Sequence, residues 1–123
     1  MIKTQNFDIP EAEAKQWYKV AEVNAFPENG GACVKIEDRQ IAVFHFKRRN
    51  EWYASQNLCP HKLQMGLSRG MIGDQSGEPK VACPFHKKTF SLKTGTNLNG
   101  EDYSIETYPV KVEDGFVYIG ITE

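Results

Sequence analysis

Short hydrophobic stretches separated by polar turns occupy both ends of the chain. They are rich in aromatic and β-branched residues and cover residues 17–21, 32–36, 40–46, 51–54, 108–112 and 116–119. Strands of this length at this spacing are typical of an antiparallel β sandwich or barrel. The Asp114-Gly115 pair between the last two stretches predicts a tight hairpin. The pattern therefore predicts an all-β fold that begins after the weakly patterned residues 1–16.

Residues 56–97 interrupt this β pattern and differ in charge from the rest of the chain. Between residues 59 and 95, six basic and two acidic residues give +4, whereas nine basic and fourteen acidic residues elsewhere give −5. No repeat or linker divides the chain. We therefore expect a single domain over residues 1–123, in which 1–55 and 98–123 form a base and 56–97 form an insert.

Composition and charge exclude several classes of protein. With 40% hydrophobic and 11% aromatic residues, the 123-residue chain can form an ordinary core, so disorder throughout is excluded. A net charge of −1 argues against a general nucleic-acid or membrane-surface binder. The start lacks the apolar run of a signal peptide, and no stretch approaches the roughly 18 apolar residues of a membrane helix. We therefore expect a cytoplasmic protein.

The three cysteines are an odd number, which argues against a disulfide framework and favours a metal or cluster site. Two of them lie in short motifs, Cys59-Pro60-His61 and Cys83-Pro84-Phe85-His86, in which a proline stiffens the loop. Two Cys and two His could hold tetrahedral zinc, but zinc sites usually pair Cys with Cys and His with His. The mixed halves suit a 2Fe–2S cluster with two Cys on one iron and two His on the other. Zinc, and a chance arrangement without any metal, are the alternatives.

Together with the segment Thr89-Phe90-Ser91-Leu92-Lys93-Thr94-Gly95, the two motifs resemble the Rieske 2Fe–2S family. The resemblance implies a Rieske-like antiparallel β fold with a cluster-binding insert of two loops. It also implies that the cluster is held by Cys59, His61, Cys83 and His86. Rieske centres have potentials of about −150 to +300 mV. The additional loop cysteines of the high-potential respiratory members are absent, so we expect a potential in the lower, ferredoxin-like part of this range.

Residues 67–74 and 77–92 carry a more particular resemblance. They are similar to the small subunits of cytoplasmic NAD(P)H-dependent nitrite reductases, which take part in reducing nitrite to ammonium. Two features differ from oxygenase ferredoxins: Lys87-Lys88 follows the second His in place of Gly, and residues 73–77 extend the gap between the motifs. The resemblance implies an electron-transfer subunit without an independent catalytic site. It further implies a large-subunit partner with flavin, a 4Fe–4S cluster and sirohaem.

Two alternatives to this function stay open. One is a free-standing Rieske ferredoxin that serves an oxygenase, and the other is a non-redox structural subunit with a vestigial or zinc-filled site. Lys87 and Lys88 are either an ordinary solvated face or cations that steer an acidic partner. Cys33 is expected to be a small buried hydrophobe on a strand. His45 is expected to be a strand residue rather than a metal ligand.

Overall fold

The computed structural model describes residues 16–60, 64–84 and 88–121, and its regular elements are β strands and three short 3₁₀ turns. The first half contains β1 (Gln16–Glu22), η2 (Val23–Ala25), β2 (Gly30–Ile36), β3 (Arg39–Phe46), η3 (Lys47–Arg49), β4 (Glu51–Gln56) and β5 (Leu58–Cys59). The second half contains β6 (Gln64–Met65), η4 (Leu67–Arg69), β7 (Met71–Gln75), β8 (Glu78–Ala82), β9 (Thr89–Ser91), β10 (Thr107–Tyr108), β11 (Val110–Glu113) and β12 (Phe116–Ile121). No helix in these described ranges is long and apolar enough to span a membrane.

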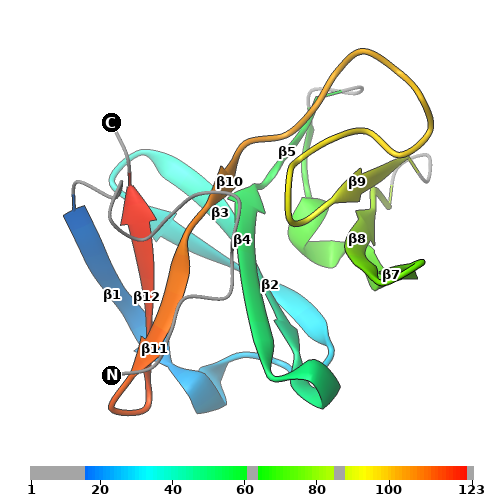
Figure 1. Cartoon of the computed structure of the whole chain (residues 1–123). Coiled ribbons are helices and arrows are strands. Elements are labelled where there is room, and N and C mark those ends of the chain that lie inside the picture. The colour runs from blue at the N-terminus through cyan, green and yellow to red at the C-terminus, as the bar shows by residue number, and fades with distance from the viewer. Residues whose placement is uncertain (1–15, 61–63, 85–87, 122–123) are drawn as a thin grey trace.

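Antiparallel pairing arranges the strands in four sheets, as Figure 1 shows. One sheet has the order β1-β12-β11, and a second has the order β10-β4-β3-β2. A third sheet has the order β7-β8-β9, and β5 and β6 form a separate two-stranded ribbon. The predicted all-β antiparallel fold is therefore confirmed.

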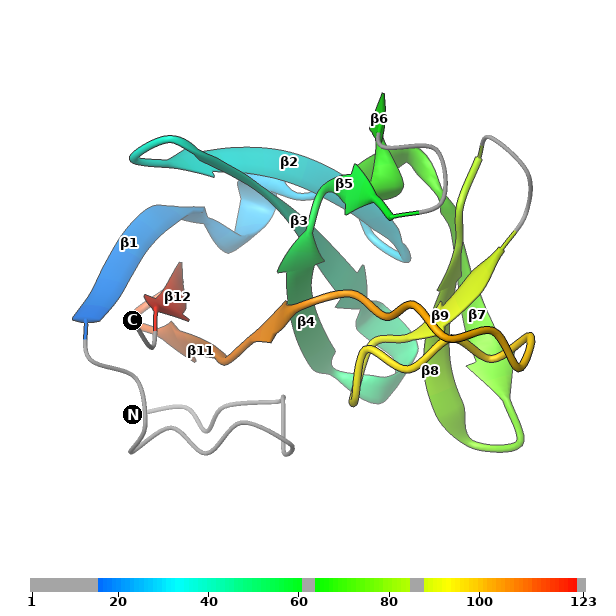
Figure 2. The ribbon, with the colours of Figure 1, turned by 90° about the horizontal axis from the view of Figure 1, so that it is seen from above.

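The second sheet is buried on both faces, so the molecule has two hydrophobic cores. On one face, Ile41 and Trp52 pack against Val117 and Ile119 of the first sheet. On the other face, further core residues pack against the β7-β8-β9 side of the molecule: Ala42, Phe44, Phe46 and Tyr53 with Leu67, Val81, Phe90 and Leu92. Figure 2 shows β2, β3 and β4 lying between these two groups of strands. All of residues 41–46 are consequently buried. In a strand with one solvated face, by contrast, buried and exposed residues alternate.

The strand stretches predicted at both ends of the chain are present, with one correction. The stretch 108–112 is divided at Pro109: β10 pairs with β4 in the second sheet, whereas β11 pairs with β12 in the first. Proline has no N–H for the ladder, so the chain can change sheets there without losing a hydrogen bond. The Pro109 carbonyl still accepts a 2.9 Å hydrogen bond from Gly120 N–H. The predicted Asp114-Gly115 hairpin is confirmed, with φ angles of 54° and 82° at the two turn residues.

The segment that the sequence pattern left without strands contains a three-stranded sheet. Residues 73–77, which we expected to be a loop, belong to the β7–β8 hairpin, in which Gln75 faces Glu78 across a Ser76-Gly77 turn. Both turn residues have positive φ, 53° and 90°, as a two-residue hairpin turn requires. Glycine and proline interrupt the apolar residues of these short strands. The alternation of apolar and polar residues that predicts a strand is therefore not visible in the sequence.

The prediction for Cys33 is wrong, because its side chain is exposed. Residues alternate across β2, so Ala32 and Val34 face the first core while Cys33 points to the opposite face. Since β2 is the edge strand of its sheet, little covers that face. His45, as expected, is a buried residue of β3, where its ring stacks on Trp52 with 3.9 Å between ring centroids.

Candidate metal centre

Cys59 and Cys83 lie side by side although 24 positions separate them in the sequence. Cys59 ends β5 and Cys83 follows β8, and their Sγ atoms are 3.0 Å apart. Neither cysteine forms a disulfide, and their exposed fractions are 0% and 1%. Because β5 and β8 belong to different sheets, the tertiary fold rather than a local motif brings the two sulfur atoms together. A pair of buried thiolates is a donor set for zinc or iron–sulfur ligation.

Asn57 fixes the chain on both sides of the segment that contains the first motif, Cys59-Pro60-His61, which we name the first candidate ligand loop. Its carbonyl accepts hydrogen bonds from Gly66 and Leu67 N–H, at 2.9 and 3.0 Å. Its side-chain Oδ1 accepts from Ser68 N–H at 2.8 Å, and its Nδ2 donates to Gln40 Oε1 at 3.1 Å. Asn57 is 4% exposed, and its hydrogen bond from the buried Ser68 N–H forms away from water. Sequence reasoning missed this residue, because a lone Asn before a cysteine carries no distinguishing signal.

The segment that contains the second motif, Cys83-Pro84-Phe85-His86, is the second candidate ligand loop. A hydrogen bond between the peptide groups of Cys83 and Lys88 joins its two ends. Cys83 N–H donates a 2.7 Å hydrogen bond to the Lys88 carbonyl, and the preceding Ala82 pairs with Thr89 in the β8–β9 ladder. The two described ends, Cys83 and Lys88, are therefore held together beside the β8–β9 ladder. Pro84, next to the buried cysteine, is exposed.

A segment from the C-terminal side, residues 97–105, lies against this loop, and we name it the cover segment. Glu101 in this segment accepts three hydrogen bonds: from Lys88 Nζ at 3.1 Å, from Tyr103 hydroxyl at 2.9 Å and from Asn97 Nδ2 at 3.3 Å. The pKa of Glu101 is lowered, with the Lys88 hydrogen bond as the largest cause. Lys88 is thus paired within the chain. The sequence had left open whether this lysine belongs to an ordinary solvated face or steers an acidic partner.

Tyr103 connects the cover segment to the cysteine pair. Its ring packs on Phe90, with 6.1 Å between centroids. Burial raises the pKa of Tyr103 to about 12, and the hydrogen bond to Glu101 and the charges of Glu101, Cys59 and Cys83 act in the same direction. The hydroxyl therefore remains protonated near neutral pH and donates its hydrogen to Glu101. The end of the cover segment is held next to Gly95, whose carbonyl accepts from Ile105 N–H at 2.9 Å.

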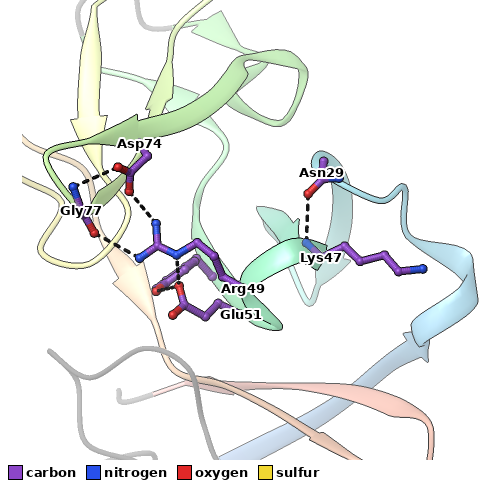
Figure 3. A network of polar contacts seen from close by, with 7 residues as sticks. Asn29, Lys47, Arg49, Glu51, Asp74 and Gly77 are labelled. Atoms are coloured by element: carbon purple, nitrogen blue, oxygen red, sulfur yellow. Dashed lines mark hydrogen bonds and ion pairs between the residues drawn. The ribbon is translucent and has the colours of Figure 1, made fainter.

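Arg49 joins the β7–β8 hairpin to the turn after β3, as Figure 3 shows. Its guanidinium contacts Asp74 Oδ1 at 2.6 Å and donates to the Gly77 carbonyl at 3.1 Å. The same group contacts Glu51 Oε1 at 3.1 Å from the other side. One planar side chain therefore bridges the hairpin and β4, which limits rotation of the hairpin relative to the base.

Of the four predicted ligands, the structure brings Cys59 and Cys83 together, whereas His61 and His86 lie outside the described residues, as does Lys87. Within the described part of the chain no group of three or more Cys, His, Asp or Glu side chains forms a metal site. The cysteine pair fits half of a mixed Cys/His centre, because both sulfur atoms are buried and neither is committed to a disulfide.

Comparison with known proteins agrees with this chemistry. Residues 16–120 match the family model described as a Rieske-like [2Fe-2S] domain. The chain is 35% identical to the Nitrite reductase [NAD(P)H] large subunit of Klebsiella oxytoca, over 90% of this chain and 11% of that protein. It is 31% identical to the Nitrite reductase (NADH) small subunit of Escherichia coli K12, over 85% of this chain and 96% of that protein. The chain thus spans about a tenth of the first relative and nearly all of the second.

A solved structure and a further relative extend the comparison. The structure of the E. coli protein NirD superposes with a TM-score of 0.79 at 30% identity, over 88% of this chain and 98% of that one. The 3-phenylpropionate/cinnamic acid dioxygenase ferredoxin subunit of Photorhabdus laumondii is 34% identical, over 85% of this chain and 93% of that protein. NirD and the Photorhabdus ferredoxin subunit are therefore each matched over most of their length.

Proposed function

Because the chain belongs to the Rieske-like [2Fe-2S] domain family, we propose that it is the electron-transfer small subunit of an NAD(P)H-dependent nitrite reductase. The observation that carries this proposal is the buried cysteine pair Cys59 and Cys83, which is not joined in a disulfide and is supplied by two separate hairpins of a fold shared with NirD. The proposed ligand set is Cys59, His61, Cys83 and His86. Residues 56–97 are the proposed cluster-binding insert, and 1–55 with 98–123 the base.

The described residues would hold a 2Fe–2S cluster and shield it from water. When bound, such a cluster supplies a centre that takes up and releases one electron at a time. The two cysteines lie among the buried residues of the second core, so their sulfur atoms are shielded from solvent. The hydrogen bond from Cys83 N–H to the Lys88 carbonyl would orient the backbone beside one of these sulfur atoms, as outer groups do in metal sites generally.

The proposed partner is a large nitrite reductase subunit that carries flavin, a 4Fe–4S cluster and sirohaem, where nitrite becomes ammonium. The Klebsiella relative supports this partner, because a segment similar to this chain lies within a protein named as the large subunit. When two proteins occur as one polypeptide elsewhere, their separate forms are expected to associate. A cytoplasmic location belongs to the same proposal.

The test is co-purification of the chain with its large subunit, followed by Cys83→Ser. We expect the variant to lose both the electron paramagnetic resonance signal of a mixed Cys/His cluster and nitrite-dependent NAD(P)H oxidation. Cys33→Ser is the matched control, because Cys33 is exposed and lies outside the thiol pair. A Cys83→Ser complex that still reduces nitrite at the wild-type rate would remove the cluster from the electron route.

A second candidate function is a ferredoxin that reduces an oxygenase, and the Photorhabdus relative favours it. The two functions differ in the acceptor of the electron. Reduced protein mixed with each purified acceptor in a stopped-flow instrument distinguishes them, because only the true partner reoxidises the cluster at a rate comparable with turnover. A zinc-containing protein without a redox signal would contradict both.

A further inference from the structure

One large apolar side chain stands out on the surface beside the cysteine pair. Met71, the first residue of β7, is 79% exposed, and the only other exposed large hydrophobic residue in the described part of the chain is Met65, at 48%. In the β7–β8 ladder Met71 lies opposite Ala82, the residue before Cys83. Single exposed apolar residues are common and by themselves indicate nothing. The surroundings of Met71 are what distinguish it.

A hollow adjoins Met71 and reaches the ligand cysteine. Its volume is about 420 Å³, and it is lined by Arg69, Met71, Ala82, Cys83 and Pro84. Cys83 itself is only 1% exposed, so the hollow ends at the buried sulfur-bearing residue rather than opening the site to water. A protein surface that filled this hollow would therefore lie next to one of the two thiols.

Cations border this apolar area. Arg69 is exposed at one end, and Lys80 lies on the same face of β8 as Ala82, two positions away. The aliphatic stem of Lys80 passes over Gly73, where its Cε would lie 3.6 Å from an added Cβ. A long stem on apolar surface with its ammonium at the rim is how lysine serves at an interface. An apolar centre with a charged rim is the usual anatomy of a docking surface.

We propose that this Met71 face, formed by Arg69, Met71, Lys80, Ala82 and Pro84, is the docking surface for the large subunit. The inference rests on the proposed function and adds the location and chemistry of the contact. The partner surface would offer an apolar pocket for Met71 and carboxylates for Arg69 and Lys80. Because Arg69 and Lys80 border the apolar centre, an acidic partner surface is attracted to this face.

The charges of the Met71 face also argue against a second copy of the chain as the protein that binds there. In a two-fold symmetric contact the same patch meets itself, so Arg69 and Lys80 of one copy would face those of the other. Like charges opposed in an interface are unfavourable. A redox partner, by contrast, must approach the cysteine pair to exchange electrons, and the Met71 face adjoins Cys83.

The experiment measures binding of the cluster-loaded chain to the purified large subunit by titration calorimetry, for wild type and three variants. Met71→Glu places a carboxylate at the apolar centre, and Arg69→Glu reverses a rim charge. Met65→Glu is the matched control, because Met65 is the other exposed methionine and lies on the separate β5–β6 ribbon. The visible absorption of the cluster reports that each variant is folded and loaded.

We expect Met71→Glu to weaken binding at least about tenfold, as loss of a central anchor does. Arg69→Glu should weaken it mainly at low salt, whereas Met65→Glu should change it less than about threefold. Two results would overturn the docking role of the Met71 face while leaving the proposed function intact. One is wild-type affinity in both Met71→Glu and Arg69→Glu, and the other is an equal loss of affinity in Met65→Glu. A wild-type dimer that Met71→Glu converts to a monomer would also overturn it. If wild-type protein does not bind the large subunit at all, the proposed function itself fails.

Discussion

The ammonium of Lys88 and the carboxylate of Glu101 are 3.1 Å apart and tie the end of the second candidate ligand loop to the cover segment. Lys88 also provides the carbonyl that accepts the Cys83 N–H. The same residue therefore closes the loop with its backbone and anchors it with its side chain. The two lysines after the second motif are thus not equivalent to a pair of free surface cations, since the described one is engaged within the chain.

Replacing Glu101 tests this anchoring. Glu101→Gln removes the charge that pairs with Lys88, so we expect the ligand loop to open more often and the cluster to be lost faster to a chelator. The effect should be about two- to fivefold in half-life, because an ion pair that is partly exposed contributes modestly. Decay of the visible absorption measures it. Glu113→Gln, on the β11–β12 hairpin, is the control, and an equal half-life in both variants would count against the anchor.

Replacing Asn57 tests the closure of the first candidate ligand loop. Asn57→Ala removes the side-chain acceptor of the Ser68 N–H in a buried region. Unsatisfied buried groups cost about 1–3 kcal/mol, so we expect a loss of that size in the free energy of unfolding. Urea denaturation of the loaded protein measures it. The exposed Asn24, changed to Ala, should lose much less, and an equal loss would contradict the role given to Asn57.

Two glycines separate the effect of backbone strain from that of close packing. Gly95 and Gly100 both have positive φ, 82° and 85°, but an added Cβ meets the Ile105 carbonyl oxygen at 2.0 Å only at Gly95. We expect Gly100→Ala to cost about 1 kcal/mol for the dihedral angle alone. Gly95→Ala must also displace the Ile105 backbone, so we expect it to cost at least about 3 kcal/mol. Thermal unfolding of both variants compares them, and equal losses would contradict the close contact.

His45 makes stability depend on pH. Its Nδ1 is buried and lacks a hydrogen-bond partner in the described structure, and burial lowers its pKa from the ordinary 6.5. A histidine with a lowered folded-state pKa takes up its proton more readily when unfolded. Stability is therefore full above pH 6.5 and is lost as the pH falls towards the folded-state pKa.

The variant His45→Phe checks this dependence. It can keep the ring stacked on Trp52 and removes the titrating group, so we expect the free energy of unfolding to change less between pH 7.5 and about 5 than in wild type. Urea denaturation across this range measures the difference between the two proteins. Parallel pH profiles would show that His45 does not contribute.

The sequence predicted the strands at both ends of the chain well because these strands have strong local signals. The Asp114-Gly115 turn and the aromatic and β-branched runs around it specify a hairpin whatever else the chain does. The β7–β8 hairpin was missed because Gly73 and Pro79 interrupt its pattern, although Ser76-Gly77 offered a turn signal. The change of sheet at Pro109 depends on which strands are neighbours, which is a tertiary property.

The candidate site shows a similar division. The cysteines could be identified from their motifs, because few other chemistries need a thiol and an imidazole in one tight loop. The groups that surround them could not, since Asn57, Glu101 and Tyr103 act through contacts between distant parts of the chain. Cys33 was wrongly predicted to be buried because its neighbours in the sequence are apolar. On an edge strand, however, burial depends on what covers each face of the sheet.

The cover segment has a consequence for biosynthesis. All four proposed ligands precede residue 97, but the carboxylate that pairs with Lys88 comes after it. A ribosome that has released residues up to 90 has produced every proposed ligand and none of the cover-segment contacts. Those contacts can therefore form only after residues 97–105 have been synthesised, and premature termination before them would yield a product with the motifs but without the enclosure.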